Sequence, residues 1–176
     1  MKTFLTIATL AAALASPAFG HATFAESEMV QGQTSRLTIR IGHGCGAEAT
    51  LRVRVAIPDG LAAVQPMVHP GWTLETITGP LAAPYTAHGR TVTEGVREII
   101  WSGELPSAYY DEFVFRAVAT DLLPVDAPVY IPVVQECATG AARWIEIPAA
   151  GQDPHSLASP APGIIIVAPG HHGHGH

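Results

Sequence analysis

A histidine stands where an apolar leader ends. Lys2 supplies a positive charge, residues 4–14 form a short apolar run, and Ala18 and Gly20 place small residues at the −3 and −1 positions of a signal-peptidase site. Cleavage after Gly20 makes His21 the first residue, so that its α-amine and ring Nδ1 can close a chelate on one metal ion. Cu(II) favours tetragonal nitrogen and oxygen ligands, and an α-amine with an unperturbed pKa of about 7.7–8.0 is readily deprotonated by a metal. The cleavage itself therefore creates a candidate copper site.

A second cleavage position stays open. Ser16 and Ala18 also satisfy the small-residue rule, and cleavage there leaves Phe19 and Gly20 ahead of His21. The amine and the imidazole would then belong to different residues. We expect residues 1–20 to be the signal peptide and His21 to be the mature N-terminus.

Composition narrows the class of protein. Nine Lys and Arg residues face fifteen Asp and Glu residues, a formal net charge of −6, and Lys2 in the leader is the only lysine. This balance disfavours nucleic acid or an anionic membrane surface as partner and is compatible with collecting cations. The leader is too short to cross a bilayer, and the other apolar run, 163–167, is shorter still. We expect an exported periplasmic or extracellular protein with no membrane span.

The two cysteines, Cys45 and Cys137, are far apart in the sequence. In an oxidising compartment they are expected to form one disulfide that closes a long loop. A pair of thiolate copper ligands and two free thiols are the alternatives.

Hydrophobic residues alternate with period two, and turn residues interrupt them about every ten positions, which is typical of an all-β sandwich. We expect a first strand over 23–30 and a hairpin that pairs 37–41 with 51–57. Further strands are expected at 64–66, 72–78, 96–101, 112–118, 128–135 and 143–147. The domain is taken as 21–160, followed by a disordered Pro/Gly/His-rich tail over 161–176. Four of its last six residues are histidines, which either bind metal loosely or form an uncommitted or appended tail.

Seven short motifs, in order along the chain, carry a family resemblance. They are GHAT at 20–23, GHGCG at 42–46, PGW at 70–72, the segment 85–95, YDEFVF at 110–115, QEC at 135–137 and RWIEIP at 143–148. With these motifs the chain resembles the YcnI-like copper-binding domain over essentially all of residues 21–160. The family was long catalogued as a domain of unknown function.

The resemblance implies an immunoglobulin-like β-sandwich, exported and often encoded among copper-handling genes. It implies Cu(II) bound through a single-histidine brace at His21 with Trp144 close to the metal. The alternative role for Trp144 is an ordinary core or rim aromatic. The family places an acid just before this tryptophan, whereas Ala142 and Arg143 stand there in this chain. The carboxylate ligand therefore remains open, with candidates Glu136, Glu146, Glu26 and Asp153.

The remaining polar residues are expected to have other roles. His43 is either a ligand or, preferably, a turn histidine bonded to backbone, and His69, His88 and His155 are expected to be solvated loop residues. The acidic pair Asp111–Glu112 is expected to face solvent. The sequence shows no Ser/His/Asp nucleophile, phosphate loop or zinc-finger spacing.

These features favour a non-enzymatic protein that buffers Cu(II) or passes it to a membrane copper transporter or another envelope copper chaperone. A copper-dependent oxidase or oxygenase is the first alternative. Oxidative polysaccharide-cleaving enzymes also begin with a metal-chelating histidine on a β-sandwich but add a second histidine, for which His43 is the internal candidate here. A metal-free adhesion or scaffold sandwich is the second alternative.

Overall fold

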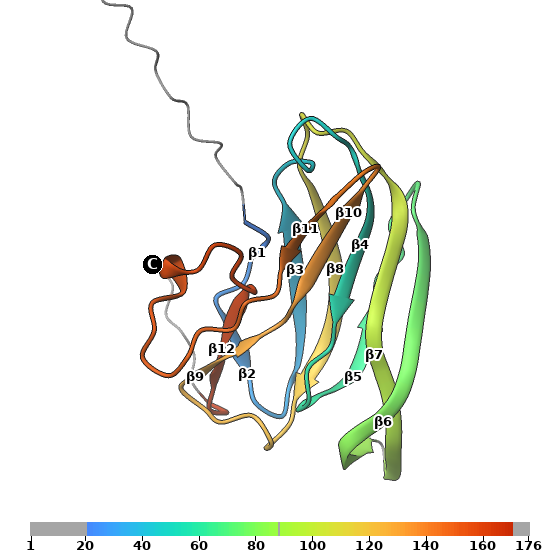
Figure 1. Cartoon of the computed structure of the whole chain (residues 1–176). Coiled ribbons are helices and arrows are strands. Elements are labelled where there is room, and N and C mark those ends of the chain that lie inside the picture. The colour runs from blue at the N-terminus through green and yellow to red at the C-terminus, as the bar shows by residue number, and fades with distance from the viewer. Residues whose placement is uncertain (1–20, 88, 171–176) are drawn as a thin grey trace, which may run out of the picture.

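The computed structural model describes residues 21–87 and 89–170 and is built almost entirely of β-strands. Two larger antiparallel sheets pack face to face, and a smaller third sheet lies at one side (Figure 1). Within the described residues the one helical segment is the 3-10 helix η1, Pro154–Ser156. The predicted all-β sandwich is confirmed. No helix in these ranges is long and apolar enough to cross a membrane.

The first sheet has four strands in the order β1-β3-β8-β5. Their bounds are β1 Thr23–Phe24, β3 Thr34–Ile41, β8 Asp111–Ala119 and β5 Leu61–Pro66. The second sheet has five strands in the order β11-β10-β4-β7-β6. Their bounds are β11 Ala141–Trp144, β10 Val133–Cys137, β4 Thr50–Ala56, β7 Arg90–Leu105 and β6 Thr73–Ala87. The proline-containing strands β5 and β6 both lie at sheet edges, where a missing N–H is tolerated.

The third sheet corrects the predicted tail. It has the order β2-β12-β9, with β2 Glu28–Val30, β12 Gly163–Val167 and β9 Ala127–Tyr130. Residues 163–167 were expected to be disordered, but β12 pairs parallel with β2 and antiparallel with β9. Ile164 and Ile166 are each 1% exposed, so the folded domain extends past residue 160. The histidines of 171–176 lie outside the described residues.

The predicted hairpin between 37–41 and 51–57 is wrong. Strands β3 and β4 belong to different sheets: β3 pairs with β8 and β1, and β4 pairs with β7 and β10. The glycine-rich connection over 42–49 carries the chain from one sheet to the other. Period-two alternation fixes which face of a strand is buried but not which strand lies beside it.

The predicted first strand over 23–30 is also divided. Strand β1 pairs with β3 in the first sheet and β2 pairs with β12 in the third. Glu26 lies at the break, where its carboxylate accepts hydrogen bonds from the Thr38 N–H at 2.7 Å and the Thr38 hydroxyl at 2.8 Å. The Glu26 carboxylate thus provides hydrogen-bond acceptors for the Thr38 N–H and hydroxyl at the point where the predicted strand is interrupted.

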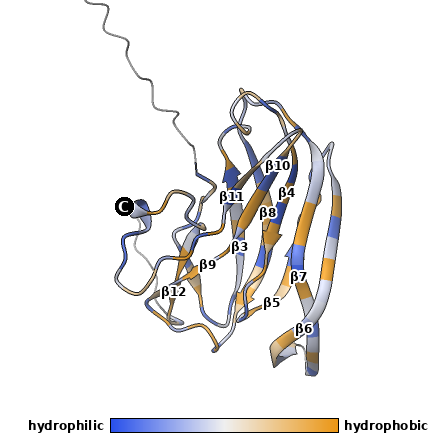
Figure 2. Cartoon of the chain, in the orientation of Figure 1, coloured by the Kyte–Doolittle hydropathy of each residue, from blue (hydrophilic) through white to orange (hydrophobic). Residues whose placement is uncertain are grey.

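The core fills the space between the sheets with alternating inward-facing side chains. Figure 2 shows the resulting hydrophobic and hydrophilic bands along the strands. The largest side chains that are fully buried are Trp101, Phe113, Phe115, Met29, Leu37, Ile39, Ile41, Leu61, Ile99, Ile131, Ile164 and Ile166. Burial of this apolar area is the main favourable contribution to folding.

The disulfide prediction is confirmed. Cys45 and Cys137 are joined, with 92 positions between them in the sequence and 6.2 Å between their Cα atoms. The bond attaches the connection over 42–49 to the end of β10. Beside it the Glu48 carboxylate accepts hydrogen bonds from the Thr139 N–H, at 2.9 Å, and from the Thr139 hydroxyl. The rim of the sandwich is thus fixed covalently next to the start of β11.

We expect Ile164→Ala and Ile166→Ala each to lower the free energy of unfolding by about 2–5 kcal/mol, the usual cost of a large buried aliphatic side chain. Ile165→Ala is the matched control, because Ile165 is 37% exposed on the same strand and should cost less than about 1 kcal/mol. Urea unfolding measures all three. Equal and small effects would mean that β12 is not part of the cooperative fold.

Candidate metal centre

His21 is held at the rim of the first sheet by the residues that follow it. Ala22 is 3% exposed and belongs to the core. Thr23 is paired with Arg40 of β3, and the Ala25 N–H donates to the Thr38 carbonyl at 2.9 Å. The chain is therefore anchored from its second residue after the predicted cleavage, and His21 itself is only partly buried.

Trp144 approaches His21 from the opposite sheet. It ends β11, where it is paired with Val133 of β10, and its side chain is buried at 3% exposure. The His21 and Trp144 ring centroids are 5.4 Å apart with an interplanar angle of 64°, an edge-to-face contact. The two residues that the family resemblance singled out are thus neighbours in space, although 123 positions separate their numbers.

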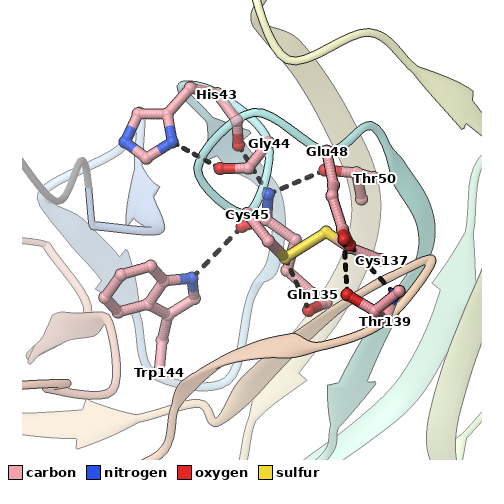
Figure 3. Close-up of a disulfide and its surroundings, with 9 residues drawn as sticks. All are labelled: His43, Gly44, Cys45, Glu48, Thr50, Gln135, Cys137, Thr139 and Trp144. Atoms are coloured by element: carbon pink, nitrogen blue, oxygen red, sulfur yellow. Dashed lines mark hydrogen bonds between the residues drawn. A yellow bond between two sulfur atoms is a disulfide. The ribbon is translucent and has the colours of Figure 1, made fainter.

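A buried glutamine holds this tryptophan. Gln135 is 2% exposed, and its amide nitrogen donates to the His43 carbonyl at 2.5 Å and the Thr50 hydroxyl at 2.7 Å (Figure 3). Its amide oxygen faces the Trp144 indole N–H at 3.5 Å. Because the indole N–H points to Gln135, Trp144 presents its ring to His21 and acts as a wall. Gln135 was not among the sequence-predicted site residues, although the period-two pattern of β10 places it on the inward face beside Val133.

His21 opens onto a groove of about 410 Å³. The groove is formed by 21–24, by Pro128 and Tyr130 of β9, by Pro154 and His155 of η1, and by 160–163 with Ile165. None of these lining residues is an aspartate or glutamate. The residues 42–49 lie elsewhere: His43 lines a separate hollow of about 400 Å³ together with Trp144 and Ser159.

The side chain of Glu136 forms ion pairs with two arginines and does not line the groove onto which His21 opens. Its carboxylate lies 3.0 Å from Arg52 and 3.1 Å from Arg54 on the outer face of the second sheet. Arg54 also pairs with Glu98 at 2.7 Å. Partial burial acts to raise the pKa of Glu136, but hydrogen bonds from Arg54 and Arg52 and their charges outweigh it, so the pKa lies below its usual value.

The other carboxylate candidates are also occupied. Glu146 accepts the Ser159 N–H at 2.6 Å, and Asp153 accepts the His155 backbone N–H at 2.9 Å. Glu26 accepts from Thr38, as described above. Within residues 21–87 and 89–170 no three His, Cys, Asp or Glu residues gather as a metal cluster. Each of the four candidate carboxylates thus has a structural partner, and none of them lines the groove onto which His21 opens.

The remaining histidines differ in their surroundings. The His43 Nδ1 lies 2.7 Å from the Gly44 carbonyl, the backbone contact expected for it. His69 was expected to be solvated, but its Nε2 lies 3.0 Å from Asp111 and its ring stacks on Phe113 at 5.1 Å. His155 is exposed, as predicted. His88 lies outside the described residues.

The acidic pair 111–112 also has partners instead of simply facing solvent. Asp111 bonds to His69, and Glu112 forms an ion pair with Arg40 at 3.0 Å. Both contacts join β8 to neighbouring segments, and neither faces the groove beside His21.

We expect Gln135→Leu to lower the free energy of unfolding by at least about 1–3 kcal/mol, because it leaves the His43 carbonyl and the Thr50 hydroxyl buried without their partner. Thr50→Val removes only one of these contacts and should cost less. Urea unfolding measures the stability, and the indole N–H resonance of Trp144 in an NMR spectrum reports the lost acceptor. A Trp144 resonance unchanged in Gln135→Leu would contradict the assigned contact.

Glu136→Gln tests the arginine contacts through their pH dependence. A carboxylate whose folded pKa is lowered stabilises the fold above its unfolded pKa, and this contribution is lost as the pH falls through the folded value. The variant should be less stable than the parent at pH 7, by about 0.5–1 kcal/mol for exposed ion pairs, and the difference should disappear once the pH has fallen below the folded pKa of Glu136. Glu94→Gln, on an exposed position of β7, is the control. A difference that stays constant with pH would contradict the assignment.

Comparisons with known proteins extend over most of the chain. No curated protein matches it. Among solved structures it is similar to an uncharacterized protein from Nocardia farcinica described as having an immunoglobulin-like fold, with a TM-score of 0.58 and 22% identity over 84% of this chain and 98% of that one. This likeness shows the immunoglobulin-like fold. A family described as a domain of unknown function (DUF1775) matches residues 21–166. The chain belongs to the DUF1775 family.

Proposed function

We propose that this protein is exported, binds Cu(II) through His21 and buffers or delivers copper in the cell envelope. The observation that carries the proposal is the placement of His21, which stands just before β1 against the buried Trp144 ring and opens onto a groove. The match to the family begins at this same residue. The motifs shared with the YcnI-like copper-binding domain support the same ion.

The donor set fits Cu(II). Cleavage after Gly20 gives His21 a free α-amine in addition to its Nδ1, two nitrogen donors of one residue that can close a chelate ring on a metal ion. Nitrogen ligands of this kind suit tetragonal Cu(II), and copper lies at the top of the affinity order for divalent first-row metals. Bound there, the ion would supply a positive, exchangeable centre. Ala22 and β1 would fix the backbone of the chelate, and Trp144 would shield one side of it from water.

The surroundings of His21 favour exchange of the ion over permanent storage. His21 is only partly buried and its groove is lined mainly by proline, alanine and aromatic side chains rather than by further anionic ligands. A membrane copper transporter or another envelope copper chaperone is the partner that such an accessible site would serve. The Cys45–Cys137 disulfide supports an oxidising compartment, in the periplasm or outside the cell.

We expect His21→Ala to weaken Cu(II) binding by more than about a hundredfold, since even groups that only support a metal ligand cost 10- to 100-fold when removed. Mass spectrometry of the exported protein first establishes that the chain begins at His21. Competition with a chelator then gives the affinity, and electron paramagnetic resonance shows whether the nitrogen-rich tetragonal signal is lost.

Selective acetylation provides a sharp control. The chain that begins at His21 contains no lysine, because Lys2 leaves with the leader, so the α-amine is its single primary amine. Acetylating it removes one donor and keeps the imidazole and every other side chain. Affinity should fall as it does in His21→Ala. A flat Cu(II) titration of the unmodified, correctly processed chain would contradict the proposal and favour a metal-free scaffold, and reductant-dependent peroxide production would favour an oxidase.

A further inference from the structure

A second imidazole lines the groove onto which His21 opens. His21, just before β1, and His155 of η1 line this groove together with Pro128 and Tyr130 of β9. Figure 1 shows the turn that carries η1 standing out from the sandwich on the same side as β1 and β12. Of the histidines in residues 21–87 and 89–170, His21 and His155 line this groove and the others do not.

The backbone around His155 is firmly held. Asp153 caps η1 by accepting the His155 N–H at 2.9 Å, and the Ser156 hydroxyl donates to the Asp153 carbonyl at 2.7 Å. The Gln152 amide donates to the Ser156 hydroxyl at 3.1 Å and accepts the Ala149 N–H at 3.1 Å. These bonds use the neighbours of His155 and its own backbone, so they fix the turn without engaging the imidazole.

Glu146 attaches this turn to the strand that ends in Trp144. Its carboxylate accepts the Ser159 N–H at 2.6 Å, its N–H donates to the Ser159 carbonyl at 3.0 Å, and its carbonyl accepts the Ala161 N–H at 2.8 Å. The loop that presents His155 and the tryptophan that contacts His21 therefore share one anchor. This gives Glu146 a structural role beside the site in place of the ligand role considered for it.

The two rings are available for a ligand. Among the described residues no group forms a hydrogen bond or ion pair with the ring nitrogens of either His21 or His155. The contact between His21 and Trp144 is an edge-to-face contact between their rings. In contrast, a ring nitrogen of His43 is hydrogen-bonded to the Gly44 carbonyl. The two ring nitrogens of His69 are hydrogen-bonded to the Pro70 carbonyl and to the Asp111 carboxylate. An exposed imidazole on a rigid turn is a nitrogen donor that needs no carboxylate to complete a copper site.

We propose that His155 is a second histidine ligand of the copper site, so that the ion is held by the α-amine and imidazole of His21 and by the imidazole of His155. The inference rests on the proposed function and deepens it, because it replaces the undefined carboxylate with a neutral nitrogen donor. A third nitrogen strengthens the selection of Cu(II), for which imidazole is a favoured ligand. The groove that both residues line would leave the remaining positions on the ion open to water or to the donor of a partner.

The test measures Cu(II) binding by the mature chain with His171, His172, His174 and His176 replaced by serine, so that the tail adds no imidazole. Pulsed electron paramagnetic resonance, with less than one equivalent of copper, counts the bound imidazoles through their remote nitrogens. The parent should show two imidazoles and His155→Ala one. The affinity of His155→Ala should fall by at least about tenfold. His43→Ala is the matched control, since His43 lies at the same rim but lines the other hollow, and it should retain two imidazoles.

The outcomes separate this inference from the proposed function. If His21→Ala loses the tetragonal signal while His155→Ala keeps the parent's imidazole count and affinity, His155 is not a ligand and the copper function of His21 stands. If His21→Ala also leaves the spectrum and affinity unchanged, both ideas fall. A two-imidazole signal lost in His43→Ala rather than His155→Ala would also overturn the assignment. Urea midpoints confirm that the variants are folded, as expected for an exposed position such as His155.

Discussion

The buried amide of Gln135 is the interaction on which the rim of this protein depends. A primary amide that is taken out of water must find partners for both its nitrogen and its oxygen, or the fold loses the cost of its desolvation. Here the partners are the His43 carbonyl, the Thr50 hydroxyl and the indole N–H of Trp144. One side chain on β10 thus sets the position of the inter-sheet connection, of β4 and of the ring against which His21 lies.

The disulfide and the amide act on the same segment for different reasons. The Cys45–Cys137 bond restricts the unfolded chain by closing a long loop, whereas the amide selects one arrangement of the folded rim. Both attach the glycine-rich connection to β10. Gly44 lets the backbone come close to its neighbours, because a Cβ at this position would lie 1.9 Å from the Glu48 carbonyl oxygen. The connection can therefore cross from sheet to sheet in few residues.

The strands and their buried faces were predictable because alternation and turn residues are local properties. Strand β8 lies within one residue of its expected bounds, and its Phe113 and Phe115 are in the core. Pairing was not predictable, since β3 and β4 are adjacent in sequence but separated across the sandwich. The segment 163–167 was predicted to be part of the tail, because a five-residue apolar run between proline and glycine residues does not by itself indicate a strand. It forms a strand here because it pairs with β2 on one side and β9 on the other. Its Ile164 and Ile166 carry the period-two signal that supports this.

The residues of the candidate site likewise fall into those that the sequence predicts and one that depends on the pairing of distant segments. His21 follows from a cleavage rule that acts on neighbouring residues, and Trp144 follows from the family motifs, so both could be named in advance. His155 could not, because three separate pairings bring its turn and His21 to one groove: β1 with β3, β12 with β9, and Glu146 with Ser159. Proline and aspartate around it indicate only a turn. In the proposed site, His21 before the anchored strand β1 supplies two nitrogen donors, and the exposed, capped turn supplies a third that solvent or a partner can reach.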